Sequence, residues 1–203
     1  TCGNGTRCIA YLISKEKKKE EITFKTRSGI LKSKILKNNT VETNIGTPKF
    51  GWKEIPLSKE IDNTNLGITI SDRDGINFTG GYALSVGNPH LIFFVNKTEN
   101  YDLPKIGPAL EKHSMFPEKC NVTLAEIKNR KSIKVKVWER GVGITKACGT
   151  AACATAVAAF KKKLTELVDW GSVPSKSKIT FLPSLHMAHL ILYGPIPIPS
   201  SQI

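Results

Sequence analysis

The stretch from Trp138 to Phe160 constrains the fold more than any other part of the chain. It reads W-E-R-G-V-G-I-T-K-A-C-G-T-A-A-C-A-T-A-V-A-A-F. Gly141 and Gly143 in its first half predict a tight turn. From Ala151 onward the residues are small, mostly good helix formers, and include no proline. We therefore expect a glycine-rich turn that leads into a buried helix, with Cys148 at or just before the helix start.

This placement gives Cys148 a chemical meaning. A helix N-terminus presents unpaired backbone N–H groups and a partial positive charge, which stabilise a thiolate or a bound carboxylate. A cysteine there can titrate below its usual pKa of about 8.5 and act as a base or nucleophile near neutral pH. The alternative for Cys148 is a small buried apolar residue, which is the common fate of a free cysteine.

The other end of the chain carries a related motif. Residues 1–9 read T-C-G-N-G-T-R-C-I, and residues 147–155 read A-C-G-T-A-A-C-A-T. Each has Cys-Gly followed by a hydrogen-bonding side chain and then an apolar run, and each carries a second cysteine, Cys8 or Cys153. Two such turns indicate two halves that present facing thiols, Cys2 and Cys148.

The remaining pattern alternates strands with short helices. A helix over residues 8–14 precedes a hairpin of residues 21–27 and 30–36 and a strand over 40–45. Gly46-Thr47-Pro48 is a boundary signal. Beyond it we expect a helix beginning near Lys105. The other expected strands cover residues 82–86, 91–95, 121–127, 133–138, 178–182 and 189–193.

Four motifs together resemble the diaminopimelate epimerase family. C-G-N-G-x-R-C opens the chain, and E-R-G-V-G-x-T-x-A-C-G-T-x-A-C-A follows Trp138. G-N-P-H at 87–90 and F-P-E-K-C-N-V at 116–122 lie between them in the order that the family shows. The resemblance covers nearly the whole chain.

The resemblance implies an α+β fold with two pseudo-symmetric halves. In each half a mixed or antiparallel sheet curves around a central helix, which carries a catalytic cysteine at its N-terminus. We assign residues 1–46 to the remainder of the N-terminal half and 47–194 to the C-terminal half. Residues 195–203 form a tail that returns to the N-terminal half. The first half is expected to be incomplete and to lack an upstream segment that supplies further substrate contacts.

The activity implied by the resemblance is epimerisation of LL- and meso-diaminopimelate without a cofactor, in lysine and peptidoglycan-precursor biosynthesis. Cys148 corresponds to the family's proton acceptor and Cys2 to its proton donor, and the two exchange roles with reaction direction. His90 and Glu139 correspond to the residues that set thiol protonation. The expected substrate-binding residues are Gly3, Asn4, Asn88, Asn121, Glu139, Arg140, Gly149 and Thr150.

Simpler structural readings exist for several of these residues. Arg140 can hold a distal carboxylate with two parallel hydrogen bonds, or it can form an internal ion pair with Glu139. The alternative for His90 is an ordinary buried turn histidine, but its neighbours Asn88 and Pro89, together with the family resemblance, favour a role in the site.

Two other classes of protein remain as alternatives. A proline or hydroxyproline racemase shares the two-cysteine architecture, but usually has His after Cys-Gly, where this chain has Asn4. A basic binding module would account for the net charge of +13. However, the lysines of residues 15–19 and 161–163 form short runs without interleaved aromatic residues, which is typical of solvated faces. We therefore expect no nucleic-acid partner.

Composition limits the setting and the partners. No apolar run approaches the roughly 20 residues needed to span a bilayer, so we expect no membrane partner. The five cysteines lack C-x-x-C spacing, which argues against a disulfide framework or a metal site and favours a reducing cytoplasm. No Schiff-base lysine with a phosphate cradle, as pyridoxal phosphate would need, is evident.

Two positions depart from the family pattern. Ile144 stands where the family usually has Glu or Gln. The tail lacks the aromatic residue of the family's dimer contacts, which leaves a homodimer open.

Overall fold

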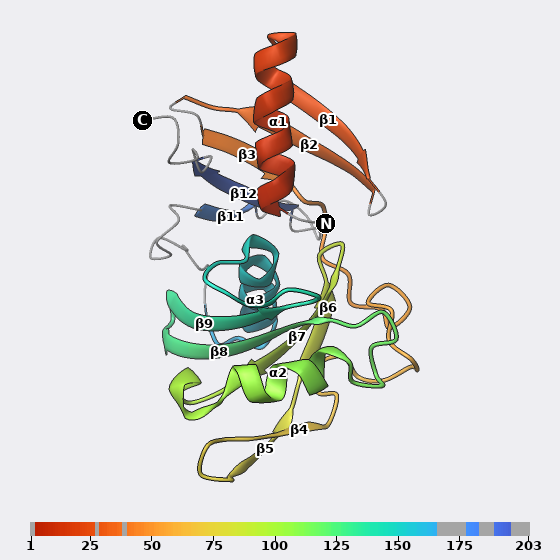
Figure 1. Cartoon of the computed structure of the whole chain (residues 1–203), viewed down its shortest axis with the longest axis vertical. Coiled ribbons are helices and arrows are strands. Elements are labelled where there is room, and N and C mark those ends of the chain that lie inside the picture. Colours follow the sequence, from red (N-terminus) through yellow and green to blue (C-terminus); the bar gives the residue numbers. More distant parts are fainter. Residues whose placement is uncertain (1–2, 27–28, 38–39, 166–177, 183–188, 196–203) are drawn as a thin grey trace. The chain divides into compact units, whose positions relative to one another are not determined.

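The computed structural model describes the chain except for residues 1–2, 27–28, 38–39, 166–177, 183–188 and 196–203 (Figure 1). The chain forms two compact units: Thr1–Thr47 with Asp169–Ile203, and Pro48–Val168. Each unit contains a five-stranded sheet and a long helix, which confirms the expected α+β class. None of the helices in the described part is long and apolar enough to cross a membrane.

The first unit is an antiparallel sheet in the order β1-β2-β3-β12-β11, with α1 packed on β1, β2 and β3. Its elements are α1 (Gly3–Lys17), β1 (Glu21–Thr26), β2 (Gly29–Ile35), β3 (Thr40–Asn44), β11 (Lys178–Leu182) and β12 (His189–Pro195). Gly3, Arg7 and Ala10 are buried at helical spacing. Ile9 and Leu12 lie on the exposed side of α1.

The grouping of strands differs from the sequence-based division in one respect. We assigned residues 178–194 to the second half, but β12 pairs with β3, so β11 and β12 extend the sheet of the first unit. Alternation predicts that a segment is a strand, but it does not identify the partner strand. The expected return of the tail concerns residues 196–203, which lie outside the described residues. The domain boundaries of the whole protein stay a prediction.

The second unit is built on a mixed sheet in the order β10-β9-β8-β7-β6, in which β7 and β8 run parallel. Its strands are β6 (Tyr82–Ser85), β7 (Pro89–Phe94), β8 (Asn121–Asn129), β9 (Ser132–Glu139) and β10 (Gly143–Thr145). A separate hairpin consists of β4 (Ile68–Ser71) and β5 (Asn77–Gly80). The remaining elements are η1 (Thr98–Asn100), α2 (Leu103–Glu111) and α3 (Gly149–Lys161).

The two helices of this unit pack on opposite faces of its sheet (Figure 1). On β8, Val122 and Leu124 belong to the apolar cluster that contains Leu103 and Leu110 of α2. Since neighbouring strand residues point to opposite faces, Asn121 faces the side covered by α3. The side chains of the sheet are therefore divided between an α2 face and an α3 face.

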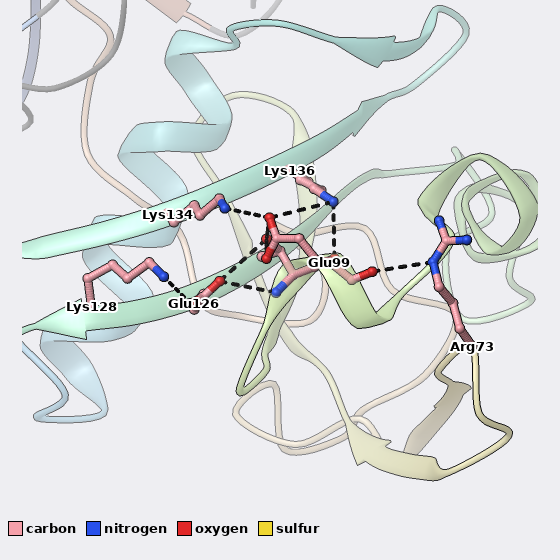
Figure 2. Close-up of polar contacts among 7 residues, drawn as sticks. Arg73, Glu99, Glu126, Lys128, Lys134 and Lys136 are labelled. Atoms are coloured by element: carbon pink, nitrogen blue, oxygen red, sulfur yellow. Dashed lines mark hydrogen bonds and ion pairs between the residues drawn. The ribbon is translucent and has the colours of Figure 1, made fainter.

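Charged residues tie η1 to the far end of β8 and β9 (Figure 2). The buried carboxylate of Glu126 accepts a hydrogen bond of 3.2 Å from the Thr98 backbone N–H and pairs with Lys128. Glu99 pairs with Lys134. We call this end of the sheet the ion-pair end. It comprises Glu99, Glu126, Lys128, Lys134 and Lys136.

Candidate active site

Three polar side chains lie at the other end of the same sheet, on the α3 face. His90 of β7 is registered with Asn121 of β8, and Val122 is registered with Trp138 of β9. Glu139 therefore follows at the level of Asn121. Trp138 packs on the α2 side against Gly107, so strand alternation directs Glu139 to the α3 side. We call the strand ends carrying His90, Asn121 and Glu139 the site end.

Cys148 is the N-cap of α3, as the sequence predicts. Its backbone is extended (φ −134°, ψ 110°), and its carbonyl oxygen accepts the first helical hydrogen bond from Ala152, at 3.0 Å. Its Sγ lies 3.4 Å from the Thr150 hydroxyl oxygen. Gly149, the first residue of α3, and Thr150 thus sit beside the thiol at the start of the helix.

The expected lowering of the Cys148 pKa is wrong for this structure. Burial raises the pKa of the Cys148 thiol to about 11, and the nearby Glu139 carboxylate adds to the rise. The Thr150 hydroxyl and the Ala151 backbone N–H stabilise the thiolate, but they do not outweigh the loss of hydration. Cys148 is therefore a protonated thiol at neutral pH.

His90 is a neutral buried imidazole. Burial, with the positive charge of Arg140 as a further cause, lowers the pKa of His90 to about 3. Its Nε2 lies 3.3 Å from Asn88 Oδ1; with this oxygen as the acceptor, Nε2 carries the ring proton. Nδ1 is then an unprotonated, buried acceptor without a hydrogen-bond partner in the described structure. A lone acceptor of this kind can accept a hydrogen bond from a neighbouring donor.

Asn121 connects two neighbouring segments through its side-chain amide. Its Nδ2 donates to the Pro89 carbonyl oxygen at 3.0 Å, and its Oδ1 accepts from the Arg140 backbone N–H at 3.1 Å. The buried amide thus fixes the start of β7 and the turn after β9 in one arrangement. We expected Asn121 to contact substrate; its described contacts are with the backbone.

The Arg140 guanidinium binds a backbone carbonyl group rather than the Glu139 side chain. Its Nη1 donates to the Glu118 carbonyl oxygen at 2.8 Å. No ion pair joins it to Glu139 within the described chain. Arg140 is partly exposed, and the remaining N–H groups of its guanidinium can donate hydrogen bonds to an anionic ligand.

Sequence reasoning missed Glu111, the last residue of α2. Its buried carboxylate accepts hydrogen bonds from Trp138 Nε1 at 2.7 Å and from the Gly141 backbone N–H at 3.1 Å. Glutamate at the end of an amphipathic helix next to a lysine normally faces solvent. No sequence signal identified its partners, because they lie about 30 positions further along the chain.

The remaining predicted residues belong to the first unit. Gly3 is the first residue of α1, and Asn4 lies in its first turn. Cys2 and the side chain of Asn4 lie outside the described residues. Among the side chains that the structure describes, no group of three or more His, Cys, Asp and Glu residues could hold a metal ion.

Comparison with known proteins bears directly on these motifs. A family model described as diaminopimelate epimerase matches residues 82–177. A diaminopimelate epimerase from Pelagibacter ubique is 64% identical over 165 residues, which cover 81% of this chain and 60% of the relative. One from Rhizobium rhizogenes is 38% identical over 201 residues, which cover 96% of this chain and 66% of the relative. The chain thus spans about two thirds or less of the length of these relatives.

Two solved structures share the fold at low sequence identity. One is a probable proline racemase from Agrobacterium radiobacter K84, with TM-score 0.63, 11% identity, and coverage of 96% of this chain and 65% of that one. The other is a phenazine biosynthesis protein of the PhzF family from Bacillus anthracis, with TM-score 0.57, 17% identity, and coverage of 96% and 73%. These likenesses confirm the fold class and carry no information about substrate.

Proposed function

The chain belongs to the diaminopimelate epimerase family, and we propose that its protein is an isomerase that interconverts LL- and meso-diaminopimelate without a cofactor. The observation that carries the proposal is Cys148 at the N-cap of α3, on the sheet face that His90, Asn121 and Glu139 share. Removal and return of an α-proton needs an acid/base group of this kind on each side of the carbon.

Cys148 is proposed as one of the two groups, and Cys2 as the other, by resemblance to the family. A turnover begins with one thiolate and one thiol: the thiolate removes the α-proton, and the thiol returns a proton to the opposite face. The raised pKa of Cys148 favours its protonated form, which suits it to donate in one reaction direction. In the other direction Cys148 must first lose its proton.

His90 and Glu139 are proposed to manage that proton. The Glu139 carboxylate lies close enough to Cys148 to raise the pKa of the thiol, so it can accept the thiol proton as substrate binds. His90 has a pKa of about 3 and is a weak base, so it acts as a neutral imidazole whose Nδ1 can accept a hydrogen bond.

Binding is proposed to use opposite charges at the two ends of the substrate. The backbone N–H groups at the start of α3 suit the carboxylate of the reacting carbon, which gains negative charge as its proton leaves. Arg140 suits the distal carboxylate, and Asn88 suits an ammonium group. Gly3, Asn4, Gly149 and Thr150 are proposed as further contacts.

Incubation of the complete gene product with LL-diaminopimelate in deuterated water tests the proposal. We expect meso product with one deuterium at the inverted α-carbon, without added pyridoxal phosphate or metal. L-proline and trans-4-hydroxy-L-proline serve as matched alternatives. Exchange on either of these, and none on diaminopimelate, would contradict the proposal in favour of the racemase.

Location and assembly are part of the proposal. A biosynthetic enzyme of this family fits the cytoplasm, and a homodimer is a possible assembly, although the tail lacks the aromatic residue of the family's dimer contacts. Fractionation of cells and light scattering of the purified protein measure the two directly.

A further inference from the structure

We infer that Glu111 is a positioning residue that sets where the turn carrying Glu139 and Arg140 lies relative to Cys148. The inference rests on the proposed function for its effect on catalysis, but its structural claim can be tested without any turnover. It starts from a buried carboxylate that the proposed chemistry does not use.

Glu111 is only 5% exposed, although it carries a carboxylate on a surface helix. Burying such a group is costly unless hydrogen-bond donors replace its hydration. Here one oxygen accepts from Trp138 Nε1 at 2.7 Å, and the other accepts from the Gly141 N–H at 3.1 Å. Both donors belong to the end of β9 and the turn that follows it, so the carboxylate spans the two residues of interest, Glu139 and Arg140.

The turn is held from both sides. The backbone N–H of Arg140 is bound by Asn121, and the N–H of the next residue, Gly141, is bound by Glu111. Gly141 has φ +76°, which glycine adopts without strain, and the Val142 N–H donates to the Glu139 carbonyl oxygen at 3.0 Å, so the turn is also closed locally. The side chains from β8 and α2 then fix where this turn lies against the sheet.

The packing around Trp138 makes the contact specific. A Cβ atom on Gly107 of α2 would lie 2.6 Å from the Trp138 ring, so the ring rests directly on the helix backbone. This close approach brings the ring nitrogen to Glu111, which is one helical turn further along α2. The helix therefore presents a flat surface and an acceptor to the same indole.

A glutamine at position 111 separates this role from general stability. Glutamine has one acceptor oxygen, and its NH2 group would face the second donor, either Trp138 or Gly141. We expect Glu111→Gln to displace the turn and lower kcat/KM by roughly 10- to 100-fold, as small misplacements near reacting groups do. Glu126→Gln is the matched control, because Glu126 is 6% exposed on the same face but binds Thr98 at the ion-pair end.

The alkylation rate of the Cys148 thiol reports whether the turn that carries Glu139 has moved. Glu139 contributes to the raised pKa of Cys148, so displacement of Glu139 increases the thiolate fraction. Alkylation of Cys148 by iodoacetamide at mildly alkaline pH, followed by peptide mass mapping, should become several-fold faster in Glu111→Gln. It should be unchanged in Glu126→Gln at the same temperature, well below both melting points.

A rescue completes the test. In Glu111→Gln with Trp138→Phe the ring donor is absent, so the glutamine oxygen can accept from Gly141 alone. We expect the double variant to recover activity and the slow alkylation rate relative to Glu111→Gln, although its smaller ring makes it less stable. Wild-type alkylation in Glu111→Gln, or a double variant that is faster still, would overturn the inference. A wild-type enzyme without epimerase activity would overturn the proposed function while the alkylation result still decides the role of Glu111.

Discussion

The two ends of the sheet in the second unit stabilise most of their polar groups in different ways. At the site end, Asn121 and Glu111 use buried acceptors to bind backbone N–H groups, and His90 is held neutral. At the ion-pair end, Glu126 is also buried and binds a backbone N–H, but Glu99 pairs with Lys134 and Lys136 through half-exposed side chains (Figure 2). Hydrogen bonds to buried backbone groups fix a geometry, whereas exposed ion pairs are screened and contribute little. Substitutions at the two ends should therefore differ in kind as well as in size.

The largest effect is expected at Cys148. Cys148→Ala removes the only acid/base group proposed for its side of the α-carbon, so kcat should fall by at least about 100-fold. The measurement is deuterium incorporation from solvent into diaminopimelate. Cys153→Ala, in the buried interior of the same helix, should lower stability and keep activity. Equal activity of Cys148→Ala and Cys153→Ala would contradict the assignment.

A loss of stability is expected at Asn121. Asn121→Ala leaves the Arg140 N–H and the Pro89 carbonyl oxygen without their partner, so the free energy of unfolding should fall by about 1–3 kcal/mol. Urea unfolding measures this change.

The control for this variant is Thr123→Val, two residues further along β8. Thr123 is fully buried, and its hydroxyl has no hydrogen-bond partner in the described structure. Its replacement by valine keeps the shape and loses no bond, so stability should be unchanged or higher. A larger loss for Thr123→Val than for Asn121→Ala would refute the account of the site end.

Lowering the pH should remove the stabilisation from the site end first and that from the ion-pair end at lower pH. The folded protein keeps His90 neutral with a pKa of about 3, against 6.5 when unfolded, so only the unfolded chain gains this proton as pH falls from 6.5. Pairing with Lys134 lowers the pKa of Glu99 from 4.5 to about 2, so its stabilisation persists down to about pH 4.5 and is then lost. Urea unfolding across this pH range should show less acid sensitivity above pH 4.5 in His90→Gln. An unchanged slope there would show that His90 is not the cause.

The smallest effect is expected at Glu99, which is half exposed. Glu99→Gln removes its ion pairs with Lys134 and Lys136, but solvent and salt already weaken such pairs. We expect a small fall in melting temperature that disappears at high salt, with unchanged epimerase activity. A loss of activity in Glu99→Gln would remove the distinction between the two ends.

The local elements of the second unit could be predicted from the sequence. The glycine-rich turn and the small apolar run after it predicted α3 and the N-cap position of Cys148. Alternation predicted β8 and β9 closely. These features depend on neighbours in the chain, which a sequence shows directly.

Features that depend on distant neighbours could not be predicted in this way. The pKa of Cys148 is set by burial under the rest of the unit, which opposed the local effect of the helix end. The role of Glu111 depends on a turn about 30 residues away, and the membership of β12 depends on its pairing with β3. Periodicity and motif spacing contain no information on such contacts.

The composition of α3 turns residue size into a means of setting depth. Every residue from Thr150 to Ala159 is buried, and six of these ten residues are alanines. Side chains this short let the axis of α3 come nearer to the sheet than leucine or isoleucine would, so their size sets the distance between helix and sheet. A methyl group added at Ala156 or Ala159 would tilt the helix and move its N-terminus. The height at which the sulfur of Cys148 stands above the strands is thus adjustable from residues that never touch it.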